Sequence, residues 1–189
     1  MNEELQNKKY LFVEGIISPE MAGICAGYAA AHRRHNFQGG DPQAPRSHSV
    51  WGDFLTESLL EALQPKVEGL AGCRLLPTYS FYRVYVPNEE LLPHRDRAAC
   101  EVSCTVCLGY DYRGKDYQWR ISIGRSRLAL RPGDAAIYLG CEVEHSRPPL
   151  LIPAGGWHAQ AFLHYVTRDG PNTDQAFDGR RALYEPRVK

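Results

Sequence analysis

The sequence predicts a mainly β protein with N-terminal helices and an all-β barrel or jelly-roll core. About seven or eight short segments rich in β-branched and aromatic residues, with turn residues between them, follow the first sixty-odd residues. Apolar residues at helical spacing occur before these segments rather than between them. Because strands and helices do not alternate along the chain, the pattern argues against βαβ units.

Two helices are expected before the β core. Ser18 is a suitable N-cap and Pro19 suits the first helical position, so an alanine-rich helix is expected over 20–34. Apolar residues at helical spacing predict a second helix over 54–63, and Pro65 is expected to begin a further helical turn. Both helices are expected to buttress the β core.

The predicted strands follow one another along the second part of the chain. A Pro-Asn-Glu-Glu turn at 87–90 separates the first two strands, and Arg-Pro-Gly-Asp at 131–134 makes a tight turn before a later one. The expected strands are 74–86, 91–96, 101–108, 119–123, 127–130, 135–139, 141–147 and 158–167.

An H-x-D pair followed much later by a single histidine is the most specific chemical signal. Residues i and i+2 of a strand project to the same side, so His94 and Asp96 can reach one metal ion while Arg95 points away. His145 would then arrive from another strand. Two imidazoles and one carboxylate suit Fe(II) and leave three coordination positions open. The alternative is three ordinary polar residues, but the predicted fold favours the metal site.

These residues and their surroundings resemble the Fe(II)/2-oxoglutarate-dependent oxygenases of the double-stranded β-helix type, in particular the prolyl-4-hydroxylase-like branch. The resemblance covers about residues 74–167 and rests on the segment 82–96, the Pro-Gly-Asp turn at 132–134 and Glu-Val-Glu-His at 142–145. It implies a double-stranded β-helix (jelly-roll) core and the three residues above as iron ligands. It also implies Fe(II) and 2-oxoglutarate as cofactors, with O2 as co-substrate.

The resemblance extends in part to the residues that bind 2-oxoglutarate. Tyr85, nine positions before the first ligand, matches a tyrosine that helps to hold 2-oxoglutarate in similar enzymes. The basic residue that such enzymes use for the far carboxylate is replaced here by Gly156. Arg147 is the candidate substitute, because it shares a strand face with the last ligand and lies ~6.5–7 Å further along. His158 and Gln160 are expected to face inward and to assist it.

The resemblance implies an enzyme that hydroxylates a substrate and releases succinate and CO2. Related halogenases have a small residue in place of Asp96, which favours hydroxylation here. The substrate is expected to be an amino acid, a peptidyl side chain or a small metabolite. Two alternatives remain open, because Gly156 departs from the family pattern. One is a catalytically silent barrel that binds a ligand or protein, and the other is a cupin-like metalloenzyme that does not use 2-oxoglutarate.

The cysteines support a competing hypothesis. Cys100, Cys104 and Cys107 have the C-x3-C-x2-C spacing that radical S-adenosylmethionine enzymes use for an iron–sulfur cluster. The surrounding residues have strand character, and an offset of three places Cys104 and Cys107 on opposite faces. We therefore expect no cluster.

Other polar residues near the predicted site give weaker signals. His164 shares the predicted strand face of His158 and Gln160, so a hydrogen-bonded barrel histidine is expected. Arg83 and Arg97 flank the site, but strand alternation alone does not decide which of them faces it.

Length and charge narrow the class of protein. The 189 residues are expected to form one domain, with a helical buttress over about 1–72, a β core over about 73–167 and a C-terminal tail at 168–189. The 22 basic and 22 acidic side chains balance, so no net attraction to nucleic acid or membranes is expected. No apolar run approaches a membrane span, and the polar N-terminus lacks the apolar region of a signal peptide. A cytoplasmic setting is expected, and the oligomeric state is left open.

Overall fold

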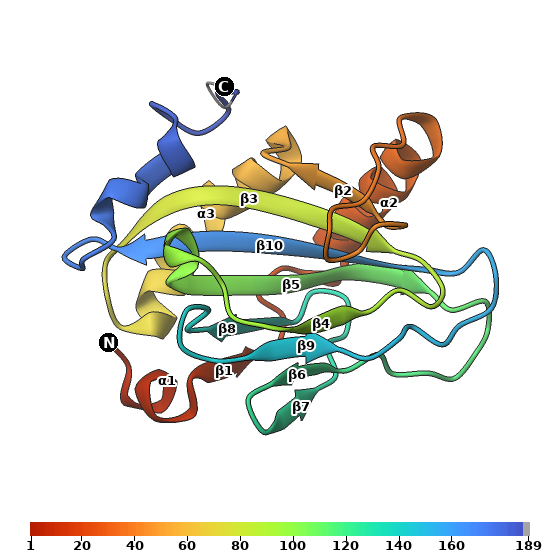
Figure 1. Ribbon diagram of the computed structural model, residues 1–189, viewed down its shortest axis with the longest axis horizontal. Helices are drawn as coiled ribbons and strands as arrows, with labels where there is room; N and C mark the ends of the chain where they lie inside the picture. The colour runs from red at the N-terminus through yellow and green to blue at the C-terminus, as the bar shows by residue number, and fades with distance from the viewer. Residues whose placement is uncertain (187–189) are drawn as a thin grey trace.

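The computed structural model describes residues 1–186 and contains two antiparallel sheets (Figure 1). The large sheet has the strand order β1-β8-β5-β10-β3-β2, and the small sheet has the order β4-β9-β6-β7. The strands are β1 (Tyr10–Val13), β2 (His48–Trp51), β3 (Leu75–Tyr85), β4 (Leu91–His94), β5 (Val102–Asp111), β6 (Ile121–Ile123), β7 (Ser126–Leu128), β8 (Ala135–Tyr138), β9 (His145–Arg147) and β10 (Trp157–Thr167). The predicted mainly β, jelly-roll architecture is confirmed.

Three helices precede the long strand β3. They are α1 (Glu3–Lys8), α2 (Pro19–His35) and α3 (Phe54–Ala71). The Ser18 side chain accepts a hydrogen bond from the backbone of Met21, so the predicted N-cap of α2 is confirmed. Buried side chains of α2 and α3 form one core cluster with the outer face of the large sheet. The helices therefore cover one face of this sheet, and the small sheet covers the other.

Helix α3 differs from the prediction at its C-terminal end. Pro65 does not begin a new turn but lies inside one continuous helix that ends at Gly72, which caps it in a left-handed conformation. Leu60, Leu63 and Val67 are buried against the large sheet on both sides of the proline. This packing offsets the backbone hydrogen bond that the proline removes.

The N-terminal part also contains strands that the sequence analysis did not predict. Strand β1 pairs with β8, and β2 pairs with β3, so both lie on the edges of the large sheet. Each has only four residues, which is too short to show an alternation that stands out from a loop. Residues 1–72 therefore contribute to the β core as well as supporting it.

Alternation along β3 and β10 sorts side chains between the two sides of the large sheet. Val84 and Leu163 pack against the helices, whereas Tyr85 and Phe162 belong to a second cluster on the inner side. A third cluster joins β5 and β8 of the large sheet to β6 of the small sheet. The functional side chains described below lie on this inner side.

The C-terminal segment packs back onto the body of the protein after β10. A short 3-10 segment, η2 (Thr173–Gly179), is followed by Arg180, whose guanidinium forms a fully buried ion pair of 2.7 Å with Glu57. A second short 3-10 turn, η1 (Ala98–Cys100), precedes β5. Within residues 1–186, no helix has the length and apolar character needed to cross a membrane.

Candidate metal centre

Two neighbouring strands of the small sheet bring the H-x-D pair and the distal histidine together. His94 ends β4, His145 begins β9, and the two residues are directly paired in the antiparallel register. Asp96 follows two residues after His94, where the chain has left the strand, and its backbone N–H donates to the carbonyl of Gly140 at 2.9 Å. The three side chains therefore converge from segments that are far apart in sequence.

The donor atoms of the three side chains face one point. The Nδ1 atoms of His94 and His145 lie 2.8 and 3.2 Å from the backbone carbonyls of Leu92 and Val143, to which each must donate a proton. Each Nε2 is therefore left with a lone pair, as a metal ligand requires. These Nε2 atoms lie 3.6 and 3.5 Å from Oδ1 of Asp96. Bonds of about 2.1 Å would place cis ligand atoms about 3 Å apart, so a small contraction accommodates a metal ion.

A hydrogen-bonded network fixes the other oxygen of the carboxylate. Ser103 donates to Oδ2 of Asp96 at 3.1 Å and accepts from Nδ1 of His164 at 2.9 Å. Burial by itself raises the pKa of Asp96, but its interactions with His145, His164 and His94 lower it overall. Burial also lowers the pKa of His164 to about 4. The network therefore keeps the carboxylate charged and turns Oδ1 toward the two imidazoles.

Gly140 provides the space that this carboxylate needs. A Cβ atom at this position would lie 2.4 Å from Oδ2 of Asp96 and 2.5 Å from the carbonyl oxygen of Cys100. Neither neighbour is the end of a long flexible chain, so a larger residue would displace the proposed ligand. The requirement for glycine here arises from the tertiary contact.

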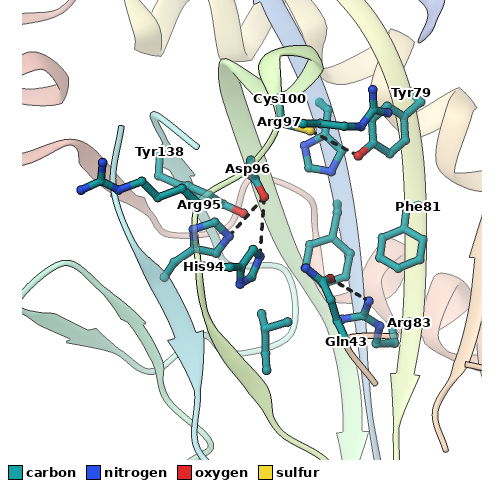
Figure 2. Close-up of a pocket in the computed structure, with 14 residues that line it drawn as sticks. Gln43, Tyr79, Phe81, Arg83, His94, Arg95, Asp96, Arg97, Cys100 and Tyr138 are labelled. Carbon is teal, nitrogen blue, oxygen red and sulfur yellow. Dashed lines mark hydrogen bonds and ion pairs between the residues drawn. The ribbon is translucent and has the colours of Figure 1, made fainter. Parts of the chain in front are cut away.

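The three side chains open into a cavity of about 280 Å³. Figure 2 shows His94 and Asp96 on one wall and Phe81 and Arg83, from β3, on the facing wall. Arg95 extends away from β3, although it also contributes to the lining of this cavity. The lining residues are Gln43, Tyr79, Phe81, Arg83, Leu91, His94, Arg95, Asp96, Arg97, Cys100, Tyr138, His145, Phe162 and His164.

Arg147 is buried without a counter-ion. Its side chain is on the same strand as His145 and is 2% exposed. It donates to the backbone carbonyl of Trp119 at 2.8 Å and to Oε1 of Gln160 at 3.2 Å, and it stacks on the Trp119 ring. No carboxylate among residues 1–186 forms an ion pair with it, and burial lowers its pKa. A fully buried cation with only neutral partners is a costly arrangement.

The other predicted 2-oxoglutarate residues surround this guanidinium. Tyr85 is fully buried and packs edge-to-face on Trp119, the ring on which Arg147 stacks. His158 donates to Oε1 of Gln160 at 3.0 Å and accepts from the hydroxyl of Tyr112 at 2.8 Å. Burial, together with the charge of Arg147, lowers the pKa of His158 to about 3, so its ring is neutral.

These four residues form a buried layer beside the metal cavity rather than part of its lining. Gln160 completes its bonds by donating to Thr105 at 2.7 Å. His158 and Gln160 are hydrogen-bonded to each other, and Gln160 also accepts a hydrogen bond from Arg147, so the pair holds the guanidinium in place. Their remaining polar groups bond to Tyr112 and Thr105, which leaves little capacity for another ligand. The connection to the cavity runs through Arg83, which lines the cavity and donates to the hydroxyl of Tyr85 at 2.8 Å.

The structure explains why a basic residue is missing at Gly156. A Cβ atom there would lie 2.8 Å from Cδ1 of Ile152 and 2.9 Å from the carbonyl oxygen of Asp111. The chain therefore excludes any side chain at this position without a backbone shift.

The cysteines lie as the strand argument predicted. Cys104 packs in the cluster between the large sheet and the helices, whereas Cys107 belongs to the cluster between the two sheets. Cys100 lies in η1 and lines the metal cavity, where its sulfur is 3.2 Å from the hydroxyl of Tyr79. Among residues 1–186, the groups suited to hold a metal ion contain at most one cysteine.

Sequence reasoning missed several residues of the site. Arg83 was not assigned to a wall of the cavity, and Gly140, Ser103 and Gln43 were not singled out. Ser103 could have been predicted to face inward, because it lies on a strand and shares a face with Thr105, two residues later. No local pattern marked the others.

Solved structures with this fold include iron- and 2-oxoglutarate-dependent enzymes. A prolyl-4-hydroxylase from Pseudomonas putida is 14% identical, with 89% of this chain and 97% of that chain covered and a TM-score of 0.65. The epimerase SnoN from nogalamycin biosynthesis is 14% identical, with 87% and 80% covered and a TM-score of 0.67. HygX from Streptomyces hygroscopicus, solved with nickel and 2-oxoglutarate, is 12% identical, with 88% and 86% covered and a TM-score of 0.62.

No protein-family model and no curated protein matches the sequence. The structural likeness therefore establishes the fold: the chain has the jelly-roll architecture of the 2-oxoglutarate-dependent oxygenases, as the resemblance of residues 74–167 predicted.

Proposed function

We propose that this protein is an Fe(II)- and 2-oxoglutarate-dependent dioxygenase that hydroxylates a small-molecule or peptidyl substrate. The observation that supports it most is the convergence of His94, Asp96 and His145 on one point in the cavity of this fold. The donor set of two imidazoles and one carboxylate fits Fe(II), and these three residues would hold the ion. O2 would be the co-substrate.

The bound iron and 2-oxoglutarate would supply the oxidising chemistry, with succinate and CO2 as products. The protein's own residues would bind and orient these groups. Hydrogen bonds from His94 and His145 to backbone carbonyls fix the tautomer of each ring. Ser103 keeps Asp96 oriented with one oxygen toward the metal. Retention of Asp96 supports hydroxylation over halogenation, as the family resemblance implies.

Arg147 would bind the far carboxylate of 2-oxoglutarate, with the hydroxyl of Tyr85 as a second donor. The support is the charge of the site: Arg147 is fully buried and has no anionic partner among the described residues, so a bound carboxylate would supply the missing charge. A guanidinium can form paired hydrogen bonds to a carboxylate from a single side chain. His158 and Gln160 would position the guanidinium.

Arg83 is the alternative receptor for this carboxylate, because it also contacts Tyr85. Its charge is already compensated by an ion pair with Asp41, whereas that of Arg147 is not. This difference favours Arg147.

Similar structures leave the substrate class open. HygX has been solved with hygromycin B bound, and a prolyl hydroxylase from Trichoplax adhaerens with a peptide fragment of hypoxia inducible factor. Both kinds of substrate, a small molecule and a peptide, are therefore compatible with this fold.

Stoichiometric Fe(II) binding under anaerobic conditions tests the metal site. His94→Ala, Asp96→Ala and His145→Ala should each lose iron while keeping the circular dichroism spectrum of the wild type. His35→Ala, an exposed histidine at the end of α2, is the matched control and should bind iron normally. Full iron occupancy in all three site variants would show that the metal, if any, binds elsewhere.

A further inference from the structure

The cavity wall opposite the proposed metal ligands contains a second buried guanidinium. The side chain of Arg83 is 2% exposed and lies beside the rings of Phe81 and Phe162, whose centroids are 4.8 and 5.8 Å from its central carbon. It donates to Tyr85 at 2.8 Å and to Ser49 at 3.2 Å, both neutral hydroxyls. These partners accept two of its five possible hydrogen bonds but do not compensate its charge.

The compensating charge comes from a loop. Residues 36–47, here called the cavity loop, connect α2 to β2 and include Gln43, which lines the metal cavity. The Oδ2 atom of Asp41 on this loop forms an ion pair with Arg83, and Gln43 accepts a hydrogen bond from the same guanidinium at 3.3 Å. Asp41 is 29% exposed, so its carboxylate reaches in from the surface rather than belonging to the buried core.

The other oxygen of Asp41 has a separate local role. Oδ1 accepts hydrogen bonds from the backbone N–H groups of Gln43 and Ala44, at 2.9 and 3.2 Å, which closes a turn. The loop is also anchored independently, since Arg46 and Ser47 donate to the buried carboxylate of Glu89 at 2.9 and 3.1 Å. The fold of the loop therefore does not depend on the contact between Asp41 and Arg83.

A cavity-facing arginine is suited to receive an external carboxylate. The guanidinium of Arg83 has one N–H more than the bonds described above use, and paired donors match a carboxylate in geometry. Phe81 and Phe162, with centroids 5.2 Å apart, provide flat apolar surface next to it. Figure 2 shows Arg83 and Phe81 facing the proposed metal ligands across the cavity. A molecule held at this wall would present its apolar part toward the metal.

We propose that Arg83 is the receptor for a carboxylate of the substrate, and that Asp41 occupies this receptor until the substrate arrives. The substrate class is then a carboxylic acid with a flat apolar group close to the acid. Binding would exchange one carboxylate for another, so the buried guanidinium would keep a counter-ion throughout. This inference rests on the proposed function, because it assigns the substrate of the same metal site.

The experiment uses the full-length protein loaded with Mn(II) and saturated with 2-oxoglutarate. The probes are benzoate and its neutral analogue benzamide. Unpaired electrons of Mn(II) broaden the proton resonances of a molecule that binds near the metal, so the broadening reports on binding in this cavity. Asp41→Asn is the main variant, since it removes the charge and retains the oxygen that closes the turn. Asp178→Asn is the control, since it removes the partner of Arg97 at the same cavity.

Asp41→Asn should tighten benzoate binding by about tenfold or more, because an internal competitor has been removed. Benzamide binding should not change, and Asp178→Asn should behave as the wild type. Arg83→Gln should abolish benzoate binding, and Arg83→Lys should retain part of it.

Equal benzoate affinity in the wild type and Asp41→Asn would overturn the inference. So would benzoate binding that survives in Arg83→Gln, which would mean that benzoate binds the metal or another wall. Loss of 2-oxoglutarate binding in Arg83→Gln, with benzoate binding retained, would assign this arginine to 2-oxoglutarate instead. Failure of the wild type to bind 2-oxoglutarate would reject the proposed function, and the benzoate comparison on the Mn(II)-loaded protein would still decide the role of Arg83.

Discussion

Replacing Arg147 with methionine should greatly weaken the binding of 2-oxoglutarate. It should change the free energy of unfolding of the ligand-free protein only slightly. Methionine has a similar length and no charge, so it fills much of the same volume. In the free protein the substitution removes a buried cation that lacks an anionic partner. Replacing buried charges by apolar side chains is often neutral or stabilising by about 1–4 kcal/mol.

Two acceptors lose a donor in this variant, which reduces the gain. The carbonyl of Trp119 loses its bond from Arg147, whereas Oε1 of Gln160 keeps the bond from His158. One lost buried hydrogen bond costs about 1–3 kcal/mol. The free energy of unfolding of the free variant should therefore lie within about 2 kcal/mol of the wild type.

Binding of 2-oxoglutarate should change far more. Removing one partner of a buried charged pair costs about 3–5 kcal/mol, which is a loss of roughly one hundred- to several thousand-fold in affinity. Ligand at a hundred times its dissociation constant stabilises the wild type by about 2.7 kcal/mol, and this gain should vanish in Arg147→Met. Urea unfolding with and without 2-oxoglutarate, on the metal-loaded protein, measures both quantities.

Arg127→Met is the matched control, because Arg127 is an exposed arginine of the same small sheet. It should leave both quantities unchanged. Wild-type affinity for 2-oxoglutarate in Arg147→Met would refute the assignment of this arginine. Strong destabilisation of the free variant would show that the guanidinium is a structural element of the core instead.

Three further predictions concern space and protonation. Gly140→Ala should abolish iron binding, because the added Cβ would lie 2.4 Å from the carboxylate of Asp96, whereas Gly69→Ala, which meets open space, should bind iron normally. Gly156→Lys, which restores the family's basic residue, should destabilise the protein by about 1–3 kcal/mol in urea unfolding and should not tighten 2-oxoglutarate binding. His158 has a pKa lowered from 6.5 to about 3, so the unfolded chain binds the proton more readily. Its contribution to the free energy of unfolding should be fully present above pH 6.5 and fall by about 1.4 kcal/mol per unit as the pH decreases toward 3.

The parts of the fold that local patterns determine were predictable from the sequence. The strands predicted over 91–96 and 135–139 correspond to β4 (Leu91–His94) and β8 (Ala135–Tyr138), because turn residues next to these segments mark them in the sequence. Strand alternation brought His94 and Asp96 to attention as a pair, but the predicted fold was needed to favour a metal site, and β4 in fact ends at His94, before Asp96. The distal His145 needed the family resemblance, because nothing in its neighbourhood distinguishes it from other histidines.

The remaining features depend on tertiary contacts. Arg83 faces the cavity because of how β3 pairs with β10, where Arg83 lies opposite Gln160. A shift of one residue in this register would turn Arg83 to the other face of the sheet. The helix continues through Pro65 because of packing against the large sheet, which no local propensity describes. The glycine requirement at Gly140 comes from Asp96, 44 residues earlier in the chain.

The central claim is that one iron ion and one 2-oxoglutarate bind together in this cavity. Anaerobic titration of the Fe(II)-loaded protein with 2-oxoglutarate tests it most directly, since chelation by the 2-oxo acid produces a metal-to-ligand charge-transfer absorption band. The band should saturate at one equivalent of 2-oxoglutarate and should be lost in His145→Ala. Protein that binds Fe(II) but develops no band would contradict the account and would favour a cupin-like metalloenzyme that does not use 2-oxoglutarate.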